Sequence, residues 1–213
     1  MAEVALALGA VDDLIEAYRD ANDALVVPIR VLGENGLVHV FQQLHGIKIT
    51  LGAVPWKGNH LNACVFRFGT PGKVERAEIY CDSALSVGWM RFAIAKELAH
   101  LLLEGPDDFL EEPVHYVQGL VDSPLFNKHG GNTSEYVFHL AAMEMLMPWK
   151  RREFLLGMNR GFGAAPKIAE HFGVPEVLVK LRLKRRFRKK LEAHHQDLED
   201  FLRRPKGTRI ATG

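Results

Sequence analysis

The residues best suited to chemistry lie in the segment Lys96-Glu97-Leu98-Ala99-His100. This segment has the frame of the zinc-binding helix motif H-E-x-x-H, with Lys96 where the first histidine belongs. Residues four apart share one helix face, so in that motif two imidazoles hold one Zn²⁺ while the adjacent glutamate reaches the metal-bound water. The metal lowers the pKa of that water to about 7, and the glutamate accepts its proton. In such a frame Glu97 is the candidate catalytic base and His100 a candidate ligand.

A zinc site of this kind needs another protein ligand from outside the motif helix. Glu135 and His139 are four residues apart on a second expected helix, so they also share a face. Zinc accepts two histidines and a glutamate while keeping a fourth position open for water. We therefore take His100, Glu135 and His139 as the candidate metal ligands.

Lys96 leaves three interpretations open, because an ammonium group with an unperturbed pKa near 10.4 is a cation that repels a metal ion. In the first, the site holds no metal, and Lys96 replaces part of the ion's charge by pairing with Glu135 or Glu97, as in a pseudoenzyme. In the second, His139 substitutes for the missing histidine and binds Zn²⁺ together with His100 and Glu135. In the third, Lys96 is an inactivating substitution, natural or engineered, and restoring histidine would restore zinc.

The site residues require two helices that face each other. Helical patterns cover about 83–103 and 134–147, and Pro148 stops the second. Between them, 104–133 contains prolines, an acidic run and a Gly-Gly pair, which is typical of a long functional loop. The chemistry is therefore expected at the contact between these two helices.

Strand signals precede the motif helix. Apolar and polar residues alternate from Ile47 to Leu51, and two further runs at 61–68 and 74–81 are joined by a turn at Gly69–Gly72. A helix at 37–44, closed by a glycine C-cap, precedes the first strand. The sequence therefore predicts an α+β fold with a small, mostly antiparallel sheet packed with helices, a zincin-like motif helix and a helical C-terminal extension.

Both ends of the chain are expected to be helical. Asp12 and Asp13 suit a helix N-terminus, and Pro28 is expected to end the helix that follows. Near the C-terminus, helices are expected at 166–172 and from 175 to about 202. The domain division that follows from these patterns is a metallopeptidase-like domain at 1–175, a basic helical extension at 176–204 and a flexible tail at 205–213.

At this point the chain resembles the ImmA/IrrE family of zinc metallopeptidases. The resemblance rests on Ile79-Tyr-Cys-Asp-Ser83, on the motif helix from Arg91 to His100, and on Ala141-Ala-Met-Glu-Met-Leu-Met-Pro148. The last is similar to the family's Phe-Ala-Ala-Glu-Leu-Leu-Met-Pro signature. Ile168–Pro175 through Arg182-Leu183 is also similar to the family's closing helical pair, so the resemblance covers about residues 10–185.

The resemblance implies a gluzincin-like fold in which Glu135 binds zinc, and a natural partner that is a helix-turn-helix repressor. Hydrolysis is expected to be impaired or lost because Lys96 replaces the first zinc ligand, and the cofactor is then zinc or none. One alternative is an active zinc endopeptidase that uses His100, Glu135 and the relocated ligand His139. A second alternative is a DNA-binding regulator that acts through its C-terminal helices.

Composition gives little sign of a nucleic-acid or membrane partner. The 213 residues carry a formal net charge of +1, and no stretch approaches the roughly 18 apolar residues of a membrane span. Residues 180–190 are densely basic, but the acids that follow them favour a solvated helix face. Cys64 and Cys81 are expected to be buried free thiols. We therefore expect a cytoplasmic protein for which nucleic-acid binding is not the main role.

Overall fold

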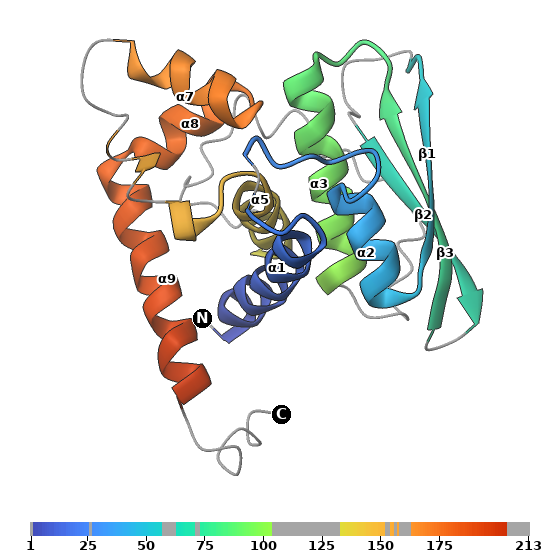
Figure 1. Ribbon diagram of the computed structural model, residues 1–213, viewed down its shortest axis with the longest axis horizontal. Helices are drawn as coiled ribbons and strands as arrows, with labels where there is room; N and C mark the ends of the chain where they lie inside the picture. Colours follow the sequence, from blue (N-terminus) through green and yellow to red (C-terminus); the bar gives the residue numbers. More distant parts are fainter. Residues whose placement is uncertain are drawn as a thin grey trace.

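A computed structural model describes residues 2–25, 27–56, 63–70, 73–103, 133–151, 154–155, 157 and 163–203. The described elements are α1 (Ala2–Ala21), α2 (Leu37–His45), β1 (Lys48–Val54), β2 (Ala63–Thr70), β3 (Lys73–Asp82), α3 (Val87–Leu103), α5 (Thr133–Leu146), η1 (Trp149–Arg151), α7 (Ala164–Phe172), α8 (Glu176–Leu183) and α9 (Arg185–Arg203). The predicted α+β class is confirmed. Figure 1 shows the sheet at one side of the molecule, with α2 and α3 against it and α7 to α9 at the opposite side.

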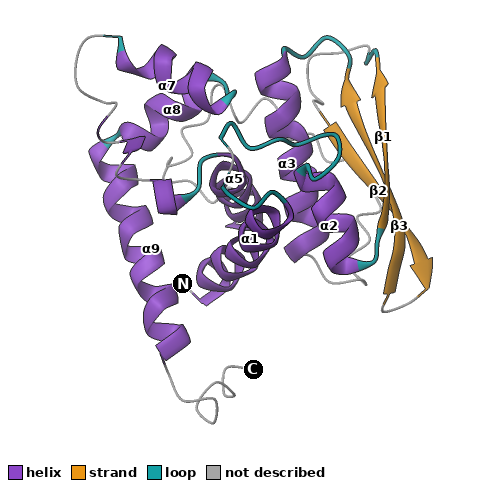
Figure 2. Cartoon of the chain, viewed as in Figure 1, coloured by secondary structure: helices purple, strands orange, loops and turns teal. Residues whose placement is uncertain are grey.

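The three strands form one sheet in the order β1-β3-β2, drawn in orange in Figure 2. β2 and β3 pair antiparallel, as the hairpin prediction requires. β1 and β3 pair parallel, with Ile49 opposite Ala77, so the expected mostly antiparallel arrangement holds for only one of the two pairs. The hairpin places its second strand in the centre, and β1 lies beside that strand instead of extending the hairpin in antiparallel fashion.

Side chains alternate between the two faces of this sheet, as strand geometry requires. On the face toward the helices, Ala77 and Ile79 of β3 are fully buried. On the other face, the Tyr80 ring lies across Gly52, where a Cβ atom would come within 2.5 Å of Tyr80 Cδ1. The Tyr80 hydroxyl donates a hydrogen bond of 3.0 Å to Glu78 Oε2. Gly52 therefore makes room for an aromatic side chain of the neighbouring strand.

The first helix differs from the sequence prediction at both ends. α1 begins at Ala2 and ends at Ala21, so Asp12 and Asp13 lie in its middle and Pro28 is well beyond it. The residues before Asp12 are mostly good helix formers, and Leu8 and Val11 among them are buried at about the same level as Leu14. Burial of this apolar stripe extends the helix past the point that the two acids indicated.

Left-handed glycines end α2 and α7. Gly46 has φ 67° and its N–H bonds to the carbonyl of Gln42, which confirms the predicted C-cap. Gly173 has φ 60° and closes α7 in the same way. The Arg91 side chain of α3 lies against Gly173 and donates hydrogen bonds to the carbonyls of Ile29, at 2.6 Å, and Phe172, at 3.2 Å. A single arginine therefore links α3 to the end of α7.

The C-terminal segment forms two helices where the sequence predicted one. α8 ends at Leu183, and Lys184 is extended, with ψ 126°, before α9 begins. Apolar side chains of both helices belong to the same buried core as those of α1 and α5: Leu178, Val179, Phe187, Leu191 and Leu198. The division at residue 176 stays a prediction. The loop expected at 104–133 lies outside the described residues except for Thr133, which begins α5, and the tail expected at 205–213 lies outside them entirely. Within the described ranges, no helix has both the length and the apolar character needed to cross a membrane.

Candidate functional site

Helix α3 carries Lys96, Glu97 and His100 and packs between the sheet and α5 (Figure 1). Because α3 is covered on more than one side, residues 92–95 are buried in succession. The polar residues that follow them are enclosed as well, and Glu97 and His100 are only 4% and 5% exposed. The motif is therefore internal to the fold, as in a buried reaction centre.

Lys96 occupies the first position of the motif as a partly enclosed cation. Its Nζ atom lies 3.8 Å from Glu97 Oε1, and the two side chains are 15% and 5% exposed. This separation is within the range of an ion pair, and a buried carboxylate needs such compensation for its charge. The contact is one of the two that the metal-free interpretation predicted for Lys96.

Two free thiols of the sheet lie near Glu97. Burial, and after it the charge of Glu97, raises the pKa of Cys64 to about 11 and that of Cys81 to about 12. Both cysteines are free, as expected from the sequence. They are directed to opposite faces of the β2–β3 pair, because Cys64 is paired with Tyr80 and Cys81 with Ala63. Neutral thiols add no negative charge to this environment.

His100 is held as a neutral imidazole. Its ring lies 3.9 Å from the Phe138 ring of α5, measured between centroids, and its carbonyl accepts a hydrogen bond of 3.2 Å from Arg67 of β2. Burial, and after it the charges of Lys96, Arg67 and His139 in that order, lower the pKa of His100 to about 2. The surroundings of His100 are therefore apolar and electropositive.

Helix α5 supplies the other predicted residues. His139 is buried, at 7% exposure, and stacks on Phe92 of α3 with ring centroids 6.0 Å apart and planes 10° apart. Glu135 lies one turn before His139 within α5, but its side chain is outside the described part of the structure. The predicted contact between the two motif helices is confirmed, whereas the ligand set His100, Glu135 and His139 stays a prediction.

The described side chains contain only part of the predicted zinc site, because the side chain of Glu135 lies outside them. An ammonium group, which has no lone pair to donate, stands at the first ligand position, whereas His100 is held in the neutral form that can bind a metal. The His139 ring of α5 stacks on Phe92 of α3, and the His100 ring of α3 lies against Phe138 of α5. Among the described residues, no group of three His, Cys, Asp or Glu side chains is arranged to hold a metal ion.

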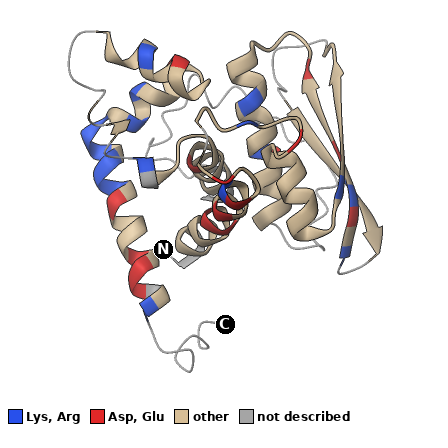
Figure 3. Ribbon diagram, viewed as in Figure 1, with Lys and Arg blue, Asp and Glu red and all other residues tan. Residues whose placement is uncertain are grey.

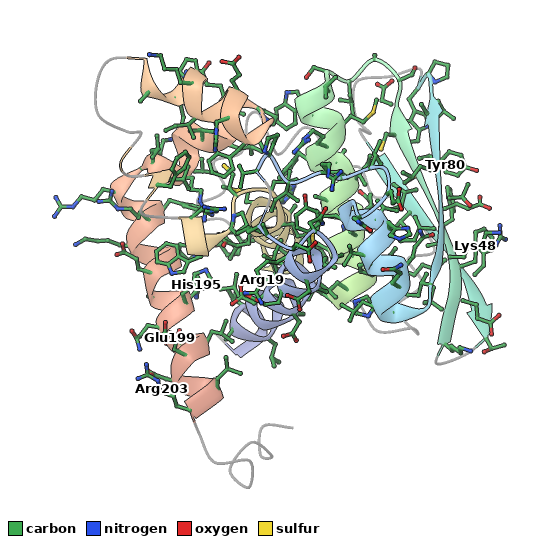
Figure 4. All side chains as sticks on the ribbon, in the orientation of Figure 1. Arg19, Lys48, Tyr80, His195, Glu199 and Arg203 are labelled. Carbon is green, nitrogen blue, oxygen red and sulfur yellow. The ribbon has the colours of Figure 1, made fainter. Side chains whose placement is uncertain are left out.

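A second buried polar cluster, centred on Glu144 of α5, was not predicted from the sequence. Its carboxylate pairs with Arg182 of α8, accepts a hydrogen bond of 2.8 Å from the Trp149 backbone N–H, and lies 3.5 Å from His195 Nε2 of α9. The His195 ring stacks on Trp149 at 4.8 Å. Figure 4 shows His195 on the side of α9 that faces the body of the molecule. The signal available in the sequence was a glutamate inside an otherwise apolar run.

The Glu144 cluster fixes the C-terminal helices to the helix that bears His139. Burial raises the pKa of Glu144, but the charge of Arg182, its hydrogen bond to the carboxylate and the nearby His195 ring more than offset that effect and lower it. The carboxylate is therefore ionised inside the protein and bound to three different segments. Its role is to position α5 against α8 and α9.

Comparison with known proteins adds no relative on which to base an assignment. No protein-family model matches the chain, and no curated protein matches it. The likeness to the ImmA/IrrE family therefore depends on the motifs and their order along the chain. What the fold adds is that α3 and α5, which carry those motifs, are in direct contact and enclose Glu97, His100 and His139.

Proposed function

We propose that this chain is an ImmA/IrrE-like protein that keeps the peptidase fold, has lost hydrolysis, and acts by binding a helix-turn-helix repressor. The observation that carries the proposal is the enclosed contact between Lys96 and Glu97, 3.8 Å apart at the head of the motif. In an active site of this type, the metal polarises the water and the peptide carbonyl. A protonated lysine supplies positive charge at that place but cannot coordinate either group.

The same contact explains how the site remains folded without a metal ion. Glu97 is 4% exposed, and leaving a carboxylate that deeply buried without a cation would cost several kcal/mol. Lys96 provides that cation from the adjacent position. With Lys96, the negative charge of Glu97 is therefore compensated by a side chain of the protein instead of by a metal ion.

The zinc content of the purified protein tests the metal part of the proposal. We expect far less than one zinc per chain in the wild type and close to one in Lys96→His, because the restored imidazole completes the motif with His100. The matched control is Lys96→His combined with His100→Ala, which should return to the wild-type level. Stoichiometric zinc in the wild type would overturn the loss of the metal, and its disappearance in His139→Ala would then support the relocated ligand.

Thermal unfolding with and without a chelator gives a second readout of the same site. The wild type should unfold at the same temperature in both conditions, whereas Lys96→His should be destabilised by the chelator, since metal binding contributes to its folding free energy. A Lys96→His variant that neither binds zinc nor responds to the chelator would contradict the family geometry of α3 and α5.

The partner part of the proposal is tested with the helix-turn-helix regulator encoded nearest to this chain. The two proteins should form a complex in size-exclusion chromatography, and the regulator should remain intact on prolonged incubation. Replacing the regulator with an unrelated helix-turn-helix protein of similar size and charge is the control. Cleavage of the regulator by the metal-free wild type would refute the loss of hydrolysis, and absence of a complex would refute the assigned partner.

A further inference from the structure

The junction of α8 and α9 carries a cluster of cations on the molecular surface. We call the five side chains Lys184, Arg185, Arg186, Arg188 and Lys189 the basic corner. Four of them are exposed and Arg188 is partly exposed. Figure 3 shows this concentration of blue at the start of α9, whereas the second half of the same helix is mainly red. The chain as a whole is nearly neutral, so the cluster is a local property of the surface.

None of the five side chains forms an ion pair with a carboxylate within the described residues. Neighbouring cations do so: Lys180 pairs with Glu176 at 2.6 Å, and Arg203 pairs with Glu199 at 3.3 Å, in each case one helical turn away. Lys190 instead lies over the Tyr136 ring, 4.2 Å from its centroid. The positive charge of the basic corner is therefore not balanced by described acids.

The charge order along α9 is the reverse of the order that favours an isolated helix. The positive end of the helix dipole is at the N-terminus, where cations are unfavourable. In α9 the first residues are basic and acids follow from Glu192 onward. The basic side chains and the positive end of the helix dipole therefore attract the same kind of ligand, an anion with several negative groups.

The apolar residues of this segment narrow the choice of polyanion. Phe187 and Leu191 are buried at 3% and 2% exposure and belong to the core, so residues 184–189 themselves present no exposed apolar or aromatic side chain. A membrane-surface helix needs exposed apolar side chains for insertion, and single-stranded nucleic acid is bound by exposed aromatic rings. A rigid cationic surface without these groups fits the phosphate backbone of a duplex.

We propose that the basic corner binds the phosphate backbone of duplex nucleic acid, without base-specific contacts. The contact would be electrostatic, with each bound phosphate releasing counterions, so affinity falls as salt rises. Five phosphate contacts correspond to a slope of about −4.5 in a plot of log affinity against log salt concentration. This binding is independent of zinc and of the proposed repressor partner, because it uses neither α3 nor the first half of α5.

Fluorescence anisotropy of a labelled DNA duplex with the full-length chain tests the inference. Between about 50 and 200 mM NaCl, a slope of −4.5 reduces the affinity by about 10²–10³-fold. Replacing all five residues of the basic corner with glutamine should lower the affinity more than tenfold and flatten the slope. Replacing only Arg185 and Arg186 should reduce the magnitude of the slope by about 2. This two-residue variant is a milder test in case the replacement of all five residues disturbs folding.

A charge-matched variant separates placement from net charge. Five exposed cations elsewhere are replaced with glutamine, which lowers the formal net charge from +1 to −4, since 1 − 5 = −4, as in the basic-corner variant. They are Arg19, Lys48, Lys73, Lys167 and Arg203. Figure 4 shows that the labelled members, Arg19, Lys48 and Arg203, lie away from the α8–α9 junction. This control should bind the duplex within about threefold of the wild type.

Three results would overturn the inference. The first is no duplex binding by the wild type at about 50 mM NaCl. The second is an equal loss of affinity in the basic-corner variant and the charge-matched variant, which would show that net charge alone is responsible. The third is tighter binding of the wild type to phosphatidylserine vesicles than to the duplex, with only the vesicle binding lost in the basic-corner variant. Circular dichroism spectra that match the wild type are required of every variant.

Discussion

Replacement of Arg182 by methionine should destabilise the protein severely, because it leaves the Glu144 carboxylate buried without its main counter-charge. The two side chains are 5% and 3% exposed, so water cannot replace the lost partner. Removing one member of a buried ion pair costs about 3–5 kcal/mol. Trp149 still donates its backbone N–H to Glu144 and His195 remains nearby, so we expect the lower end, about 3 kcal/mol. That is a large part of the 5–15 kcal/mol typical of a whole domain.

Urea unfolding followed by far-ultraviolet circular dichroism measures this cost. Arg182→Met combined with Glu144→Gln should be less destabilised than Arg182→Met alone, because the double variant has no uncompensated charge. Lys180→Met on the same helix is the control, since Lys180 and Glu176 form an exposed pair that contributes at most about 1 kcal/mol. A cost below about 1 kcal/mol for Arg182→Met, or simple additivity in the double variant, would refute the assigned role of the pair.

The same pair predicts a pH dependence whose sign is fixed by the pKa of Glu144. The folded-state pKa is lowered, so the stability that the ionised carboxylate contributes is present above its unfolded pKa of about 4.3 and is lost as pH falls below it. In Arg182→Met, burial of the carboxyl group acts without the arginine charge and favours the protonated form. The destabilisation caused by Arg182→Met should therefore be larger at about pH 7.5 than at about pH 4.5. An equal cost at both pH values would contradict this account.

Two glycine replacements test close contacts in the fold. Gly173→Ala should lower the unfolding free energy by about 1 kcal/mol more than Gly46→Ala. Both glycines have positive φ, but only at Gly173 does the new Cβ come within 3.1 Å of the Arg91 guanidinium carbon. Equal costs would show that the Arg91 side chain moves freely. Gly52→Ala should cost about 1–3 kcal/mol through its clash with the Tyr80 ring, and most of that cost should vanish in a Tyr80→Ala background, as a double-mutant cycle by urea unfolding would measure.

The parts of the fold that the sequence predicted depend on short-range patterns. The hairpin of β2 and β3 follows from two apolar runs around a turn, and the C-cap at Gly46 from a glycine at the end of a helical pattern. The helices of the candidate site are similar: α3 and α5 were expected within a few residues of their observed bounds. Each of these features is determined by residues close together in the chain, so one sequence is enough to find it.

The features that the sequence did not predict depend on contacts between distant residues. Nothing at Lys184 breaks a helix locally, yet α8 ends there, while Arg182 is bound to Glu144 and Phe187 is buried in the core. The start of α1 at Ala2 depends likewise on burial, and α1 lies close to α9 at Gly9, where an added Cβ would be in ordinary van der Waals contact with Leu198 Cδ1 at 3.4 Å. The parallel pairing of β1 with β3 also joins segments that no local pattern relates.

Glu97 and Glu144 are both buried carboxylates, and each needs a nearby cation to compensate its charge. The two residues obtain that cation in different ways. Glu144 finds its cation 38 positions away, in Arg182, and thereby fastens the C-terminal helices to α5. Glu97 has a cation at the neighbouring position of the same helix, in Lys96. Loss of Arg182 would therefore affect the assembly of the fold, whereas replacing Lys96 with histidine exchanges one compensating charge for a metal ion that brings its own. If the proposed function holds, we expect Lys96→His to introduce a metal ion without altering the arrangement of α3 and α5, so this substitution separates the chemistry of the site from its architecture.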